Sequence, residues 1–343
     1  MSVRLSQVSN PETLEVSVPS QQGPTEGTVA EIGEFGLIDS VTRHRSQPEH
    51  TLLGPGDDAA LVAAPDGKVV ASTDMLVQNV HFRLDWSSPA QVGRKAVAVN
   101  LADVAAMGAM PTAVLVGLAC PGATRTEQIT ELADGMWEEA ERAGVGLVGG
   151  DVVAADQIVI SVTALGDLRG VTAVRRSGAR PGEVVAINGR LGWSAAGLAV
   201  LGRGFRSPVS VVNAHRYPEP PYAAGPEAAA AGATAMIDIS DGLLADLGHV
   251  ATASGVGIDV DSNALPVDQK LIEVASALGA EPLRWVLTGG EDHALAATFP
   301  SAREVPPGWR RIGVVAAAAD RGVGVTVDGK PYEPEQGWQH WRG

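Results

Sequence analysis

Short apolar runs alternate with longer amphipathic segments along most of the chain, and this alternation constrains the fold more than any other feature. In the first half we expect helices at 33–44, 90–108 and 127–144 and strands at 59–65, 68–75, 112–120 and 157–168. Ser88-Pro89 predicts a helix start, and Asp66-Gly67 predicts a hairpin between the first two strands. The second half repeats the alternation, which predicts an α/β or α+β protein of two domains.

The length of 343 residues also favours two hydrophobic cores over one. We expect a flexible tail at 1–30, an N-terminal domain at 31–168 and a C-terminal domain at 169–343. The tail has neither a basic start nor a continuous apolar block, and no apolar stretch reaches membrane-spanning length. The sequence therefore predicts a soluble cytoplasmic protein with no membrane partner.

Composition and common motifs exclude several classes of function. The net charge of -15 argues against a nucleic-acid partner, which normally requires a basic face. Cys120 is the single cysteine, so a disulfide framework and a cysteine-based zinc site are excluded. No P-loop is present, and the G-x-G-x-x-G match at 144–149 has its helix before it and its strand after it, the reverse of a dinucleotide site.

Aspartates occupy turns and expected strand ends at several separated places, namely Asp57, Asp58, Asp74, Asp151, Asp238 and Asp241. Carboxylate oxygens are ligands that Mg²⁺ prefers in proteins. Each of these residues also has an ordinary explanation. Asp241 could be the N-cap of the helix that follows it, and Asp74 and Asp151 could bond their own backbone in turns.

Asp103 is harder to explain as an ordinary acid. It lies on a largely apolar helix, where a carboxylate is costly unless it is paired or bound to a metal. Arg94 and Lys95 are two turns away, beyond the usual reach of an ion pair along a helix. Asp103 therefore favours a site.

Three further features carry little information alone. His81 is most simply a partly buried histidine, and the Gly-Gly-Glu-Asp segment at 289–292 could be a turn. Arg175 and Arg176 could be a solvated pair in a linker, although arginines at such a place could also neutralise phosphate.

Eight segments taken together resemble the thiamine-monophosphate kinase family. In chain order they are GEFGLI, GPGDDAA, STDMLVQNVHF, AVNLADVAAMGAMP, GGD, RSGARPGE, DISDGLLADLGH and LTGGEDHAL. The resemblance implies a PurM-like fold, shared with aminoimidazole ribonucleotide synthetase and selenophosphate synthetase. In that fold the N-terminal domains pair in a homodimer, and the nucleotide lies in a cleft near the dimer interface. It also implies ATP-dependent phosphorylation of thiamine monophosphate to thiamine diphosphate.

The resemblance further implies roles for individual residues. The metal-binding positions are Asp58, Ser72, Thr73, Asp74, Asp103, Asp151, Asp238 and Asp241; the ATP-binding positions are Gly150, Asp151, Arg176 and Ser240; the substrate-binding positions are His81, Glu291 and Trp338. Transfer of a phosphoryl group between two anions needs positioning and charge neutralisation, which several Mg²⁺ ions would supply. No nucleophile or general base is assigned, because the acceptor phosphate is already ionised at neutral pH.

Some positions depart from the pattern of the family. His293 stands where a tyrosine is common after GGED, and Gln339 replaces the usual aspartate beside Trp338, the expected aromatic platform for the cationic thiazolium. An aromatic contact to adenine near Met136 or Trp137 is not securely aligned.

Two alternatives stay open at this point. One is an ATP-dependent enzyme of the same fold with another acceptor, although selenophosphate synthesis would call for a reactive cysteine near the N-terminus, which the tail lacks. The other is a metal- and nucleotide-binding regulator that has lost catalysis, which the presence of all six implied aspartates disfavours.

Overall fold

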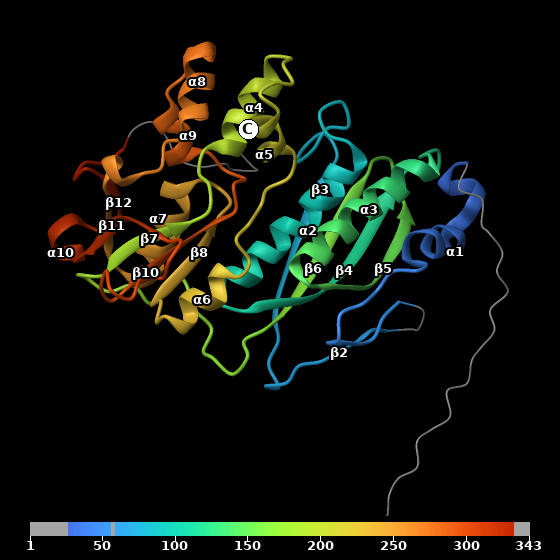
Figure 1. The fold of residues 1–343 in the computed structure, drawn as a ribbon, viewed down its shortest axis with the longest axis horizontal. Helices are drawn as coiled ribbons and strands as arrows, with labels where there is room; N and C mark the ends of the chain where they lie inside the picture. Colours follow the sequence, from blue (N-terminus) through green and yellow to red (C-terminus); the bar gives the residue numbers. More distant parts are fainter. Residues whose placement is uncertain (1–26, 56–58, 333–343) are drawn as a thin grey trace, which may run out of the picture.

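The computed structural model of this chain describes residues 27–55 and 59–332. Figure 1 shows two β-sheets side by side, each with its helices, and helix α2 (Pro89–Ala106) between them. The first sheet has the strand order β3-β6-β4-β5, and the second has the order β12-β9-β11-β7-β10-β8. The expected mixed α/β fold is confirmed.

Between residues 27 and 168, the described part of the first half contains a four-stranded sheet and three helices. Its strands are β3 (Val70–Val77), β4 (Met110–Cys120), β5 (Gly146–Ala154) and β6 (Val159–Asp167). Strands β4 and β5 are parallel, and the other neighbours are antiparallel. Helix α2 packs against α3 (Thr126–Ala143) and against β3, β4 and β6, whereas α1 (Val29–Thr42) contacts α3 and β5. A separate ribbon pairs β1 (Thr51–Leu53) with β2 (Leu61–Val62).

The hairpin expected across Asp66-Gly67 is wrong. Gly67 does turn the chain with a φ of 71°, and the Lys68 N–H donates to Asp66 Oδ1 at 3.0 Å. The strands on either side of this turn pair elsewhere, β2 with β1 and β3 with β6. Strand β5 was not among the strands expected from the sequence. Helix α1 begins at Val29 instead of residue 33, and Gly33 (φ 70°) interrupts its helical geometry.

Helix α2 follows its sequence signals closely. Ser88 Oγ accepts the Gln91 N–H at 3.3 Å, and Gln91 Oε1 accepts the Ser88 N–H at 3.0 Å, which forms a capping box with Pro89 at the first helical position. Gly108, with a φ of 75°, lies just beyond its end. Helix α3 likewise matches its expected range, and Gly144 ends it in a left-handed conformation.

The second half contains the six-stranded sheet and seven helices among the described residues. The strands are β7 (Val184–Asn188), β8 (Ala235–Ile239), β9 (Gly257–Val260), β10 (Ala294–Phe299), β11 (Arg310–Ala316) and β12 (Gly324–Val327). The helices are α4 (Trp193–Gly202), α5 (Val209–Arg216), α6 (Ala224–Ala230), α7 (Leu243–Ser254), α8 (Gln269–Leu278), α9 (Pro282–Thr288) and α10 (Ala318–Arg321).

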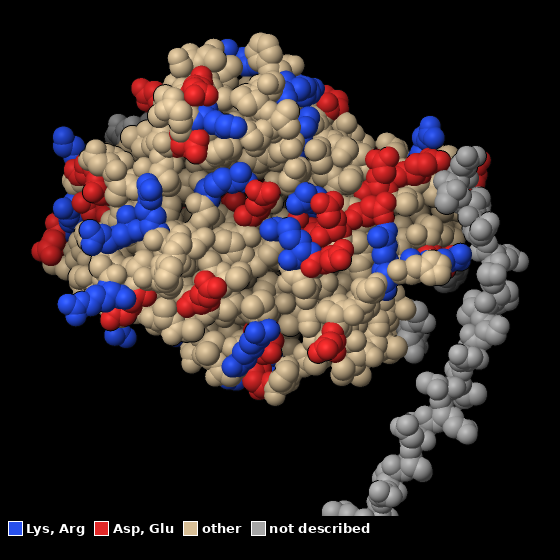
Figure 2. Space-filling view, viewed as in Figure 1, with Lys and Arg blue, Asp and Glu red and all other residues tan. Residues whose placement is uncertain are grey.

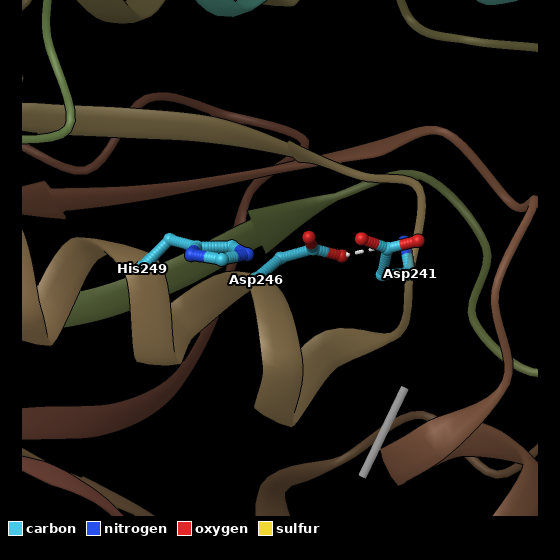
Figure 3. A group of neighbouring side chains, drawn as sticks. All are labelled: Asp241, Asp246 and His249. Carbon is cyan, nitrogen blue, oxygen red and sulfur yellow. Dashed lines mark hydrogen bonds between the residues drawn. The ribbon is translucent and has the colours of Figure 1, made fainter. Parts of the chain in front are cut away.

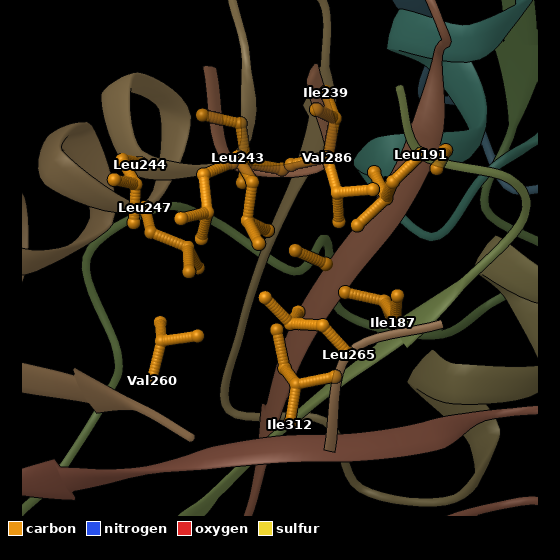
Figure 4. Packing of buried hydrophobic residues seen from close by; sticks show 14 of the residues in the cluster. Ile187, Leu191, Ile239, Leu243, Leu244, Leu247, Val260, Leu265, Val286 and Ile312 are labelled. Carbon is orange, nitrogen blue, oxygen red and sulfur yellow. The ribbon is translucent and has the colours of Figure 1, made fainter. Parts of the chain in front are cut away.

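Buried hydrophobic residues connect the two halves through α2. In the second half, a cluster seen in Figure 4 joins Leu247 of α7 and Val286 of α9 to Ile312 of the sheet. Another cluster contains Ala105 of α2 together with Phe299 of β10. Helix α2 therefore packs on both sheets, and its side chains can reach a site that both halves share.

The two sheets lie on either side of the expected domain boundary at 168, and the boundary itself stays a prediction. Most of the expected tail at 1–30 lies outside the described residues. None of the helices in the two described ranges combines the length and apolarity needed to cross a membrane. On the face seen in Figure 2, acidic side chains are interspersed with basic ones.

Candidate active site

A group of acidic side chains gathers where β3 meets α2. Ser72 and Asp74 are separated by one residue along β3, so their side chains share the face of the strand that looks toward α2. Ser72 Oγ donates to Asp103 Oδ2 at 2.7 Å, and the Asp74 N–H donates to Asn100 Oδ1 at 2.7 Å. A strand of the first sheet and a helix shared by both halves thus hold the two carboxylates.

Asp238 joins this group from the second sheet and brings His293 with it. Asp238 lies in β8, His293 directly precedes β10, and these strands are neighbours. His293 Nδ1 lies 3.0 Å from Asp238 Oδ2, and both side chains are buried. Burial opposes protonation, but the hydrogen bond and the charge of Asp238 outweigh it and raise the pKa of His293. His293, which departs from the family pattern, therefore contacts the acidic group.

The electrostatics of this group fit a bound divalent cation. Burial raises the pKa of Asp103 to about 6, and the charges of Asp238 and Asp74 act in the same direction. Carboxylates this close destabilise one another unless protons or cations neutralise them. The oxygen donors Ser72, Asp74, Asp103 and Asp238 are of the kind that Mg²⁺ prefers, so the residues present suit the expected metal.

Asp241 lies beside this group in the turn before α7, and the alternative that it is an N-cap is wrong. Gly242 occupies the N-cap position, and Asp246 Oδ2 accepts the N–H groups of Asp241 and Gly242 at 3.0 Å each. Figure 3 shows Asp241, Asp246 and His249 in a row, with ligand atoms within 4.8 Å of one another. Burial, then the charges of Asp238 and Asp241, raise the pKa of Asp246 to about 7.

Asp246 and His249 were not among the site residues expected from the sequence. The signal that could have found them is an acid in the first turn of the expected helix, followed three residues later by a histidine on the same side. The role of Asp246 in holding the backbone of the 241–242 turn could be seen only in the structure.

The segment at 289–293 is more than a surface turn. The Glu291 N–H donates to the Ser240 carbonyl at 2.7 Å, and the His293 N–H donates to the Ile239 carbonyl at 2.9 Å. Glu291 (φ 63°) and His293 (φ 52°) adopt left-handed backbone conformations, which cost energy in residues other than glycine and cluster at functional sites. A Cβ on Gly290 would lie 2.6 Å from the Ser240 carbonyl oxygen, so this close approach requires glycine.

Lys95 brings together two of the expected substrate-binding residues. Its Nζ donates to the His81 carbonyl and to Glu291 Oε1, both at 3.0 Å. The imidazole of His81 accepts the Val77 N–H at Nδ1 at 3.0 Å. The contact between Lys95 and Glu291 crosses from the first half to the second.

His215 of α5 approaches the other oxygen of the Glu291 carboxylate. His215 Nδ1 lies 3.4 Å from Glu291 Oε2 and 3.1 Å from Ser194 Oγ. Burial, followed by the charge of Lys95, lowers the pKa of His215 to about 4, so this imidazole is neutral at physiological pH. Both polar neighbours use the same ring nitrogen, which is not the arrangement of a catalytic triad, where each nitrogen has its own partner. No sequence signal indicated this role for Lys95 or His215.

Asp292 belongs neither to the acidic group nor to the contacts around Glu291, and it binds the backbone at the start of helix α4. Its Oδ1 accepts the Ser194 N–H at 2.8 Å, and its other oxygen accepts the Gly192 N–H at the start of α4. Burial raises the pKa of Asp292 to about 7 despite these hydrogen bonds. Asp292 thereby fixes Ser194, which in turn contacts His215.

Asp151 lies on the opposite face of the first sheet from Asp74. Met75 pairs with Ser161, Ser161 with Gly117, and Gly117 with Asp151. Paired residues point to the same face, so Asp151 shares the face of Met75, and the neighbouring Asp74 points the other way. Within one chain, the side chain of Asp151 is therefore not part of the acidic group. Asp74 and Asp151 also lie inside strands, which corrects their expected placement at a strand end and a turn.

The side chain of Thr73 also lies on the opposite face of the first sheet from Ser72 and Asp74. Its hydroxyl donates to the Val162 carbonyl at 3.0 Å and accepts from Thr163 Oγ1 at 3.2 Å. The hydroxyl of Thr73 thus lies on the face of Met75, apart from Ser72 and Asp74, because side chains alternate along a strand.

A cavity of about 1050 Å³ borders the face that carries Asp151. Its lining includes residues of α1, of β2 and of α3, among them Met136 and Trp137. Trp137 is buried, and its Nε1 donates to the Val41 carbonyl at 2.9 Å. No contact between adenine and this part of α3 is assigned.

Several expected site residues lie elsewhere or outside the described ranges. The side chain of Arg176 is exposed, and the adjacent Arg175 carbonyl accepts the Met236 N–H, so Arg176 flanks the start of β8, whereas Asp238 lies near its end. Ser240 lies just beyond that end, against Glu291. Asp57, Asp58, Trp338 and Gln339 are outside the described residues.

The fold and the sequence both have close counterparts. The family model for AIR synthase related protein, N-terminal domain, matches residues 56–168, and that for the C-terminal domain matches residues 180–326. The thiamine-monophosphate kinase of Mycobacterium tuberculosis is 55% identical over 313 residues, which cover 91% of this chain and 92% of that protein. The thiamine-monophosphate kinase of Corynebacterium glutamicum is 42% identical over 327 residues, 93% of this chain and 96% of its own.

Solved structures resemble this chain over a similar extent. AaThiL complexed with AMPPCP and TMP is 34% identical, with a TM-score of 0.75, and the match covers 91% of this chain and 98% of that one.

Proposed function

Because this chain belongs to the thiamine-monophosphate kinase family, we propose that it transfers the γ-phosphoryl group of ATP to thiamine monophosphate. A phosphate oxygen of the acceptor forms the new bond to phosphorus as the bond to the leaving ADP oxygen breaks, and thiamine diphosphate is released. The observation that carries this proposal is the direct contact between two groups of residues. The acidic group around Asp238 and the acceptor residue Glu291 meet where the Glu291 N–H binds the Ser240 carbonyl.

We propose that Mg²⁺ is held by Ser72, Asp74, Asp103, Asp238 and Asp241. When bound, Mg²⁺ would neutralise the charge of the phosphates that meet at the site. The protein contributes by fixing these carboxylates: the hydroxyl of Ser72 orients Asp103, and the imidazole of His293 orients Asp238. Asp246 holds the turn that carries Asp241.

Positioning is the main task of the remaining residues. The ionised acceptor phosphate needs no base to remove a proton, so catalysis requires that donor and acceptor phosphates be held in line. We assign His81, Glu291 and Trp338 to the acceptor, and Gly150, Asp151, Arg176 and Ser240 to ATP. The use of ATP as co-substrate favours a cytoplasmic location.

We propose that the protein acts as a homodimer that pairs through the open face of the first sheet. Met75 (54% exposed), Leu115 (37%) and Val153 (52%) place large apolar side chains on the face that also carries Asp151. Apolar side chains grouped in this way on one face are typical of protein interfaces. Because the sheet separates Asp151 from the acidic group of its own chain, we propose that Asp151 reaches the acidic group of the partner subunit around the edge of the first sheet.

A chromatographic assay tests the proposed reaction. Purified protein with ATP and Mg²⁺ is expected to convert thiamine monophosphate to thiamine diphosphate and to leave unphosphorylated thiamine unchanged. Asp103→Asn should lower the rate by at least about 100-fold, since it removes a ligand that neutralises transferring phosphates. The exposed Asp156, changed to Asn, is the matched control and should keep full activity. Binding of ATP without formation of diphosphate would mean that another acceptor is used or that catalysis has been lost.

A further inference from the structure

Lys95 is a buried cation whose partners lie in both halves of the protein. The residue is 2% exposed and sits on α2, the helix that packs on both sheets. Its ammonium group donates to the His81 carbonyl in the first half and to the Glu291 carboxylate in the second. A lysine this deeply buried is stable only if its charge is compensated, and Glu291 supplies the compensating charge.

Glu291 is held from several sides and still has room for a ligand. Its backbone binds the Ser240 carbonyl, one carboxylate oxygen contacts Lys95, and the other lies near His215. The side chain is 35% exposed, and a carboxylate can accept about four hydrogen bonds. Lys95 and His215 therefore orient the carboxylate without using all of its capacity to accept.

We propose that Lys95 is a positioning residue for the acceptor, because it fixes Glu291 and the backbone of His81 in one geometry across the two halves. This inference rests on the proposed function, which assigns both partners to thiamine monophosphate. Burial alone would raise the pKa of Glu291, but the charge of Lys95 outweighs burial and lowers the pKa below its usual value. Glu291 is therefore an anion at neutral pH, suited to a cationic acceptor.

Arg94 provides a matched comparison one residue earlier on the same helix. It is also largely buried and paired, with Glu139 and Glu138 of α3, both in the first half. Its removal breaks a buried ion pair without touching His81 or Glu291. Arg94→Met therefore shows how the loss of an ion pair distant from the acceptor residues affects the kinetics. Lys95→Met shows how the loss of the ion pair with Glu291 affects them.

The test is steady-state kinetics with thiamine monophosphate and ATP varied separately. Lys95→Met is expected to raise the KM for thiamine monophosphate by about tenfold or more and to leave the KM for ATP within about twofold. Lys95→Arg should recover part of the loss, since it keeps the charge. Arg94→Met should leave both KM values near those of the wild type.

A double variant guards against simple misfolding. Lys95→Met leaves the partly exposed Glu291 carboxylate without its lysine, whereas Lys95→Met combined with Glu291→Gln removes both charges together. If Lys95 acts through Glu291, the double variant should have a KM for thiamine monophosphate no higher than about that of the worse single variant.

Two results would overturn the inference. One is a Lys95→Met protein, or the double variant if the single one does not fold, with an unchanged KM for thiamine monophosphate. The other is a rise of the KM for thiamine monophosphate and of the KM for ATP that is equally large in Lys95→Met and in Arg94→Met. That result would show that Lys95 has only the structural role of an ion pair. A wild-type protein that forms no thiamine diphosphate would instead refute the proposed function, and this inference with it, so the wild-type assay separates the two failures.

Discussion

Asp103 is the residue of the proposed metal site whose pKa is raised by burial and by the charges of Asp238 and Asp74. Its pKa of about 6 lies above the value of about 3.9 expected in an unfolded chain. Below about pH 4 Asp103 is protonated in both the folded and the unfolded protein, so it does not lower the free energy of unfolding there. As the pH rises from about 4 to 6, the unfolded chain releases the proton first, and the metal-free protein loses stability through that window.

The prediction at this scale concerns metal-free protein, prepared with EDTA. Asp103→Asn should raise the free energy of unfolding at pH 7.5 by about 2 kcal/mol, because it removes a carboxylate that is ionised only at a cost. The difference should vanish near pH 4, and Mg²⁺ should raise the stability of the wild type more than that of the variant. Urea unfolding at the two pH values measures this. Equal stabilities of variant and wild type at pH 7.5 would show that Asp103 is not electrostatically strained.

Helix α2 is the element that sets the spacing of the site. It carries Lys95 at the acceptor end and Asp103 at the metal end, eight positions apart, which corresponds to about 12 Å along a helix. Its place depends on close contact with α3, since a Cβ on Gly93 would lie 1.9 Å from the Leu132 carbonyl oxygen. Displacement of α2 would move both ends of the site together.

Gly93→Ala is therefore expected to lower the free energy of unfolding by about 2 kcal/mol or more, because the two helices must move apart. The control is Gly248→Ala in α7, where an added Cβ meets nothing within 4 Å. That change should stabilise the protein by up to about 1 kcal/mol through helix propensity. Thermal and urea unfolding distinguish the two; similar behaviour of both variants would contradict the account of the α2–α3 contact.

Helices were predictable from sequence because their signals are local. Ser88-Pro89 begins α2 and Gly144 ends α3 as expected, since caps act within a few residues. Strand pairing was not predictable: β2 and β3 flank a good turn, yet each pairs with a strand selected by packing elsewhere.

The same distinction separates the site residues found from those missed. Asp103 stood out because a lone acid on an apolar helix is anomalous within its own segment. The role of Lys95 depends on a partner 196 residues away, and the face of Asp151 depends on register across three strands, and neither leaves a local trace.

The whole molecule presents the proposed site in two parts. The acidic group lies on the α2 side of the first sheet, and Asp151 lies on its open face. In the proposed homodimer, each active site would combine the acidic group of one subunit with Asp151 of the other.

This arrangement predicts complementation between inactive variants. Asp103→Asn and Asp151→Asn proteins should each be inactive, but a mixed dimer would contain one site with no substitution and one with both. Co-expression should therefore restore up to about a quarter of wild-type activity, since about half of the dimers are mixed and each has one working site. Leu115→Asp in both chains, which disrupts the proposed interface, should abolish the recovery. Failure to recover activity in verified mixed dimers would show that each site is built within one chain.

The loop at 291–293 directs three successive side chains to three different structures. Glu291 reaches Lys95, Asp292 holds the start of α4, and His293 holds Asp238. A ligand that shifts Asp238 also shifts His293, and with it the backbone of residues 291–293 that orients Glu291. If the acidic group binds a metal–nucleotide and Glu291 binds the acceptor, as proposed, the two binding events are energetically coupled. By thermodynamic linkage, the factor by which one changes the affinity for the other is the same in both directions.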